Sequence, residues 1–135
     1  MEKDEFQTIL LAVVYDPKEK KILLGRREND PHLKQLTWCF PGGKPNHDDE
    51  LEVALKKKVK LKTGCDVTSL GSIFIRIAPE KRDQILIYYL CEAIDGEITP
   101  GDDIVELKWV SPEEVEKHFT TSFHPNLKEY IMNLK

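Results

Sequence analysis

Short runs of apolar residues alternate along this chain with turn-forming and charged segments. Runs rich in β-branched and aromatic residues are typical of strands, and three lie in the first third of the chain, at 7–15, 21–27 and 38–40. Asp16-Pro17-Lys18 predicts a turn between the first two runs, so we expect them to form a hairpin. Residues 28–37 are predicted to form a loop, and Pro41-Gly42-Gly43 should end the third strand.

The remainder of the chain predicts a helix, three more strands and two further helices. Residues 48–62 should form the first helix, because acids cluster at its start, lysines at its end, and Gly64 supplies a stop. The apolar runs at 70–78 and 85–93 predict a long hairpin. The other expected elements are a strand at 104–110, a helix that begins with Ser111-Pro112, and a final helix over 126–134.

The order of these elements predicts a mixed α/β (α+β) fold. The chain has 135 residues, the length of one ordinary domain, and no low-complexity stretch divides it. We therefore expect a single domain over 1–135, with enough buried surface for a real core.

Charge and composition narrow the classes of function. Twenty Lys and Arg against 24 Asp and Glu give a net charge of −4, which does not favour general nucleic-acid binding. The longest apolar run, Ile9 to Tyr15, is too short for a membrane span. Three cysteines without a CxxC pair favour reduced thiols, and with the acidic N-terminus they predict a cytoplasmic protein that does not engage a membrane.

The segment from Trp38 to Cys65 carries a recognisable motif. It resembles the Nudix box, G-x5-E-x7-R-E-U-x-E-E-x-G-U, in which U is a bulky apolar residue. With Gly43 as the first glycine, Asp49 takes the first acidic position, Lys57 the arginine and Gly64 the second glycine. Two flanking segments, 23–27 and 109–114, also resemble the family, so the resemblance implies a Nudix-type α/β/α sandwich with a mixed β-sheet.

The box has lost the residues that carry its chemistry. In active Nudix enzymes, glutamates of the box hold magnesium, which polarises a diphosphate and helps to activate water. The three glutamate positions of R-E-U-x-E-E are here Lys58, Leu61 and Lys62. The resemblance therefore implies a degenerate active site, in which Asp49 is the one metal ligand that the box retains.

Helical periodicity gives the lysines a separate interpretation. At about 100° per residue, an apolar stripe is expected to contain Leu51, Ala54, Leu55, Val59 and Leu61. Lys58 and Lys62 project within this stripe, whereas Lys56, Lys57 and Lys60 point away from it. The inward pair either extends to solvent, or holds the phosphates of a ligand in place of metal, or pairs with Asp48, Asp49 or another carboxylate.

Further candidates for ligand binding lie around the box. The Pro-Gly-Gly turn allows close approach of the backbone, and the amides of Gly42 and Gly43, with the adjacent Lys44, are candidates to bind phosphate as the chain enters the helix. Arg26 and Arg27 point in opposite directions from their strand, so we expect one of them to face the cleft.

The candidates for catalysis outside the box are weaker. The resemblance places an additional acid of some Nudix enzymes near Glu80 and Asp83, in the hairpin turn. His124, followed by Asn126 and Tyr130, is similar to the end of the GDP-mannose mannosyl hydrolase branch, as is Asn29-x-Pro31, and implies a histidine base. A helix-capping role for His124 is the alternative.

Three functions fit these observations, and we rank them in this order. The first is a protein that binds a nucleoside diphosphate-linked ligand, either a nucleotide or a nucleotide-sugar, without efficient metal-dependent hydrolysis. The second is a hydrolase of such a ligand, with a reduced Mg²⁺ or Mn²⁺ site that includes Asp49. The third is a protein-interaction module.

Overall fold

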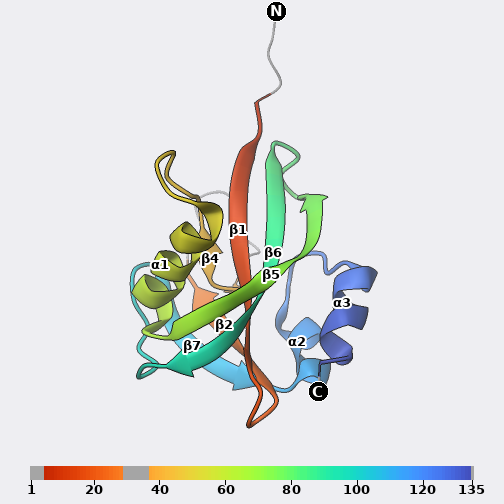
Figure 1. Ribbon diagram of the computed structural model, residues 1–135. Coiled ribbons are helices and arrows are strands. Elements are labelled where there is room, and N and C mark those ends of the chain that lie inside the picture. The colour runs from red at the N-terminus through yellow and green to blue at the C-terminus, as the bar shows by residue number, and fades with distance from the viewer. Residues whose placement is uncertain (1–4, 29–36, 135) are drawn as a thin grey trace, which may run out of the picture.

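The computed structural model describes residues 5–28 and 37–134 (Figure 1). Most of the loop predicted at 28–37, including Asn29 and Pro31, lies outside the described residues. Within the part described, no helix is long and apolar enough to cross a membrane.

The described strands form one mixed sheet. They are β1 (Gln7–Asp16), β2 (Lys21–Arg27), β3 (Trp38–Cys39), β4 (Gly42–Gly43), β5 (Asp66–Ile77), β6 (Gln84–Asp95) and β7 (Ile104–Val110). The main order is β3-β2-β1-β6-β5, while β4 pairs with β1 and β7 pairs with β2. Only β1 and β6 pair in parallel among these strands, and both predicted hairpins are confirmed.

Helices cover both faces of this sheet (Figure 1). They are α1 (Leu51–Thr63), α2 (Pro112–His118) and α3 (Pro125–Met132). Alternate residues of β1 enter two separate cores: Leu10 packs with α1, whereas Val13 packs with α2 and α3. The predicted α/β/α sandwich with a mixed sheet is therefore confirmed.

The start of α1 differs from the prediction. The helix begins at Leu51 and not at residue 48, because Asp48 and Asp49 belong to a turn in which the Asp49 amide donates to the Asn46 carbonyl at 3.2 Å. Glu50 is the N-cap residue, and Glu52 is the acid that lies in the first turn. The predicted cluster of acids therefore precedes the helix for the most part.

The C-terminal end of α1 is fixed by a loop that leads into β7. Gly64 adopts a left-handed conformation with φ 76° and donates its amide to the Lys60 carbonyl. The amides of Thr99 and Gly101 donate to the carbonyls of Thr63 and Lys62 at 2.9 and 3.0 Å. Because these bonds satisfy the last carbonyls of the helix, they hold Lys62 beside the start of β7.

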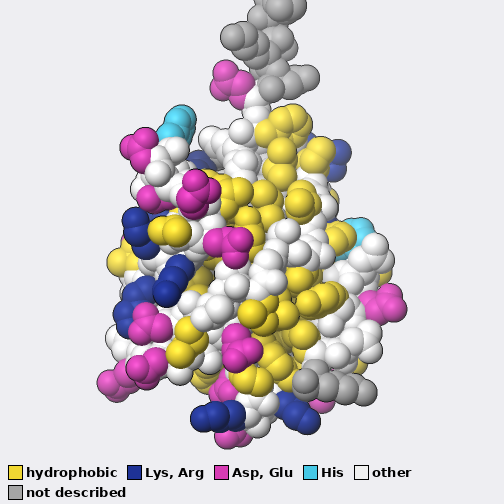
Figure 2. All heavy atoms as spheres, in the orientation of Figure 1, with side chains coloured by type: hydrophobic (Ala, Val, Ile, Leu, Met, Phe, Trp, Pro, Cys, Tyr) yellow, Lys and Arg dark blue, Asp and Glu magenta, His cyan; other side chains and the backbone are white. Residues whose placement is uncertain are grey.

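Exposed apolar residues gather along β5, the edge strand of the main sheet order. Figure 2 shows hydrophobic side chains over β5 and β6. The most exposed large ones on these two strands are Leu70, Ile75, Ile77 and Ile94.

Gly42 should be essential for the contact between β4 and β1. A Cβ atom at Gly42 would lie 1.9 Å from the Leu10 carbonyl oxygen, a backbone atom that cannot move aside. We expect Gly42→Ala to lower the free energy of unfolding by about 3 kcal/mol or more, as in severe overpacking. Urea unfolding of this variant beside Gly43→Ala checks the prediction. A Cβ atom at Gly43 meets only the flexible side chain of Lys58, at 3.3 Å, so equal losses in the two variants would contradict it.

Cys91 should make stability fall at alkaline pH. Burial raises the pKa of its thiol to about 12 from an ordinary value of 9.0. Since the unfolded chain ionises first, the stabilisation is complete below pH 9 and is lost as pH rises toward 12. Urea unfolding at pH 8 and pH 10.5 should show a smaller loss in Cys91→Ala than in the wild type. Parallel losses would contradict the assignment.

Candidate ligand-binding site

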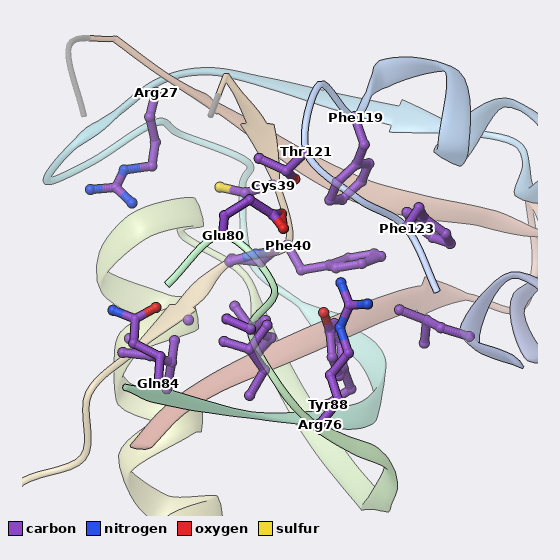
Figure 3. Close-up of a pocket in the computed structure, with 18 of the residues that line it drawn as sticks. Arg27, Cys39, Phe40, Arg76, Glu80, Gln84, Tyr88, Phe119, Thr121 and Phe123 are labelled. Atoms are coloured by element: carbon purple, nitrogen blue, oxygen red, sulfur yellow. The ribbon is translucent and has the colours of Figure 1, made fainter. Parts of the chain in front are cut away.

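A pocket of about 270 Å³ lies where the two glycines of β4, the β5–β6 hairpin and the α2–α3 connection meet (Figure 3). This volume is near the lower limit of about 300 Å³ that is typical of small-molecule sites. The pocket has a cationic end and an aromatic end, which Figure 3 shows on opposite sides, with Arg27 at one and Phe123 at the other.

The cationic end is built on one carboxylate. Asp103 lies between the guanidinium of Arg27, at 2.8 Å, and the ammonium of Lys62, at 3.3 Å. The side chain of Lys62 is only 13% exposed. Arg27 and Lys62 both line the pocket, so two cations share one paired acid there. The ion-pair interpretation of Lys62 is therefore confirmed, with Asp103 as its partner.

Gly42, Gly43 and Lys44 also line the pocket, but the two glycines do not lead directly into a helix. They form β4, which pairs with Leu10 and Leu11 of β1, and α1 begins only at Leu51. The expectation that this turn opens the helix is wrong, because residues 44–50 intervene. The close approach of the backbone is confirmed at Gly42, where β4 meets β1.

The lysines of α1 divide as the periodicity predicts. Lys58 and Lys62 are partly buried, whereas Lys56, Lys57 and Lys60 are exposed. The aliphatic stem of Lys58 packs over Gly43, and Lys58 does not line the pocket. The predicted stripe is wrong at both of its ends, because Leu51 is 41% and Leu61 57% exposed.

The two arginines of β2 separate as expected. Arg27 faces the pocket. Arg26 instead bonds Glu28 and Glu106, at 2.9 and 2.8 Å, and these hydrogen bonds raise its pKa. Arg26 is therefore not brought to the site.

A hydrogen-bonded chain links the β5–β6 hairpin to the α2–α3 connection. The Nη2 atom of Arg76 donates to the carbonyl oxygen and the Oγ atom of Ser122, at 3.2 and 3.1 Å. The amide of Ser122 donates to Glu80 Oε1 at 3.1 Å, and its hydroxyl donates to Glu80 Oε2 at 2.9 Å. Glu80 lines the pocket, but its carboxylate holds this loop in place.

Aromatic rings form the opposite end of the pocket. Phe40 lies 5.1 Å from Phe119 and 6.0 Å from Tyr88 between ring centroids, and Phe123 packs against Phe119 at 5.0 Å. Burial raises the pKa of the Tyr88 phenol, and the neighbouring Arg76 guanidinium opposes this rise. This wall has no signal in the sequence beyond scattered aromatic residues, since its members come from three separate segments.

The other candidate catalytic residues lie outside the pocket lining. Asp49 is paired with Lys57 at 3.3 Å. Asp83 is paired with Lys81 at 3.0 Å, and this hydrogen bond lowers its pKa. His124 is the N-cap residue of α3: its Nδ1 atom accepts from the amide of Asn126 at 3.0 Å, which confirms the capping interpretation.

The residues present do not fit a divalent cation at the end of α1. A magnesium site needs several oxygen ligands, and the carboxylate of Asp103 is already paired with the ammonium of Lys62. Throughout residues 5–28 and 37–134, no three His, Cys, Asp or Glu side chains are grouped so that they could hold a metal ion.

Together, the sandwich and its pocket define a small α/β/α protein whose pocket has cationic side chains at one end. The chain belongs to the Nudix family, since the family model of the NUDIX domain matches residues 6–133. No curated protein matches the sequence.

Solved structures share this fold at low sequence identity. A NUDIX hydrolase from Nitrosomonas europaea superposes with a TM-score of 0.79 at 17% identity, covering 97% of this chain and 73% of its own. A MutT protein from Methanosarcina mazei superposes with a TM-score of 0.74 at 18% identity, and the match covers 99% of this chain and 96% of the other. An ADP-ribose pyrophosphatase from Streptococcus suis superposes with a TM-score of 0.62 at 24% identity, and the match covers 79% of this chain and 75% of the other.

Glu80 should act on the pocket through the loop that it holds. In Glu80→Gln the charge-assisted bonds from Ser122 are weakened, so the amide of Ser122 should exchange with deuterium about tenfold faster. Hydrogen exchange resolved at this amide by NMR checks the prediction. Asp83→Asn is the matched control, because Asp83 lies in the same turn and its carboxylate pairs with Lys81 instead. Equal exchange in the two variants would contradict this role.

Proposed function

We propose that this protein binds a nucleoside diphosphate-linked small molecule, a nucleotide or nucleotide-sugar, and grips its phosphates with protein cations instead of magnesium. The observation that carries the proposal is Lys62, a mostly buried ammonium that lines the pocket at a position where the Nudix box has a glutamate. Arg27 and Lys44 add two further cations to the same pocket.

The charge of the pocket supports an anionic ligand. Among the described residues, four cationic side chains line it, Arg27, Lys44, Lys62 and Arg76, against a single carboxylate, Glu80. Asp103, which is not a lining residue, offsets part of this charge through its ion pairs with Arg27 and Lys62. Guanidinium and ammonium groups form strong charge-assisted hydrogen bonds to phosphate, and few waters compete for them in a partly closed site.

The diphosphate class also agrees with the family. One solved relative is named as an ADP-ribose pyrophosphatase, which acts on a nucleoside diphosphate joined to a second group. We extend only the ligand class to this chain. Hydrolysis is not part of the proposal, since Asp49 is paired with Lys57 and the carboxylate of Glu80 is bonded to Ser122.

Lys62 should determine metal-free affinity. Calorimetry with ADP-ribose and GDP-mannose in the presence of chelator should give binding by the wild type that added magnesium does not strengthen. Lys62→Met keeps the aliphatic stem and removes the ammonium, so affinity should fall about tenfold or more. The charge reversals Lys58→Glu and Lys62→Glu together should weaken binding at least as much.

Two comparisons make this experiment decisive. Lys56→Glu changes the charge of an exposed lysine on the same helix and should leave the affinity unchanged. Thermal melting of each variant separates loss of binding from loss of folding. Unchanged metal-free affinity in Lys62→Met, with the fold intact, would overturn the proposed role of Lys62.

A turnover assay separates the competing functions. Metal-dependent release of product from the same ligands, abolished by Asp49→Asn, would show a hydrolase with a reduced metal site. The absence of both binding and turnover would favour an interaction module, for which the exposed side chains of Leu70, Ile75 and Ile94 offer an apolar surface.

A further inference from the structure

The guanidinium of Arg76 has one donor without a partner among the described residues. Its Nη2 atom bonds Ser122 twice, which fixes the position of the planar group. Its Nε atom is buried and has no hydrogen-bond partner within the described parts of the chain. A buried N–H group without a partner is costly, so an acceptor that reaches this donor stabilises the complex. Because Arg76 lines the pocket, a bound ligand can supply that acceptor.

The surroundings of Arg76 restrict what this acceptor can belong to. In Figure 3 the side chains of Arg76 and Tyr88 run alongside each other into the pocket, near the ring of Phe40. Phe119 and Phe123 complete the aromatic wall on this side. Flat apolar walls favour a planar ring, and one fixed cationic donor at its edge favours a ring oxygen over a ring amino group.

Arg76 and the phosphate-binding cations occupy different ends of the pocket. Arg27 and Lys62 are joined through Asp103 at one end, whereas Arg76 is bonded to the 119–123 loop at the other. Figure 3 shows Arg27 and Phe123 on opposite sides of the pocket. A ligand with phosphates at the first end therefore presents its nucleobase at the second.

We propose that Arg76 selects nucleobases that carry a carbonyl oxygen, and not an amino group, at position 6 of a purine or position 4 of a pyrimidine, an inference that rests on the proposed function. Guanine, hypoxanthine and uracil present such an oxygen, which accepts from the guanidinium. Adenine and cytosine present an amino group there, which places a donor against a donor and leaves the buried N–H without a partner. Among purines, the preference is therefore for guanine and hypoxanthine over adenine. Among pyrimidines, it is for uracil over cytosine.

Competition calorimetry with unmodified diphosphates tests this preference. GDP and IDP should bind about 10- to 100-fold more tightly than ADP, and UDP more tightly than CDP by a similar factor, as expected for a hydrogen bond to a charged donor. IDP separates the carbonyl of guanine from its 2-amino group, because hypoxanthine keeps only the carbonyl.

Variants of Arg76 test the assignment to this residue. Arg76→Met keeps the length of the stem and removes every donor, so the GDP-to-ADP affinity ratio should fall to about one. Arg82→Met, which alters an exposed arginine of the neighbouring turn, should keep the wild-type ratio. Ser122→Ala loosens the same loop without removing the guanidinium, so it should lower both affinities and preserve their ratio.

The outcomes distinguish this inference from the function on which it rests. Binding of all five diphosphates with equal affinity would overturn the role of Arg76 and leave the proposed function standing. A preference that persists in Arg76→Met would assign selectivity to another group and also overturn the role. No binding of any diphosphate or nucleotide-sugar, in a folded protein, would overturn both.

Discussion

The ion bridge from Arg27 through Asp103 to Lys62 is the constraint on which the site depends. Two cations that lie close together and mostly out of water repel each other and lose hydration, so one carboxylate between them makes their arrangement tolerable. The bridge also ties three elements together, since Arg27 ends β2, Lys62 lies in the last turn of α1, and Asp103 directly precedes β7.

The backbone around this bridge keeps Nudix geometry although the charges have been reversed. Gly64 ends α1 in a left-handed conformation, and the amides of Thr99 and Gly101 bind its last carbonyls. These contacts involve the main chain and do not depend on which side chain stands at position 62. The C-terminal end of a helix also favours a cation over an acid, because the backbone carbonyl groups give that end a partial negative charge. A lysine at this position therefore preserves the scaffold while changing its chemistry.

How far the sequence predicts the molecule depends on the range of the interaction. Alternation of apolar residues and the turn signals predict the strands and both hairpins, because these patterns are local. The helix stripe is right at Val59 and wrong at Leu61, since periodicity gives direction but not whether another element covers that direction. Asp103 and Ser122 have no local signal, because their partners Lys62 and Arg76 lie about forty residues away in the chain.

The two ends of the pocket differ in the ligand groups that they can bind, and different elements of the fold hold each end in place. The cationic end is held by main-chain contacts at α1 and by Asp103, so its charge is fixed whatever the ligand carries at its other end. The aromatic end depends on a surface loop that Glu80 and Arg76 attach to the hairpin. Substitutions in that loop can change selectivity while leaving the phosphate end intact. On the proposed function, affinity for diphosphates and choice of base are therefore separable properties of this chain.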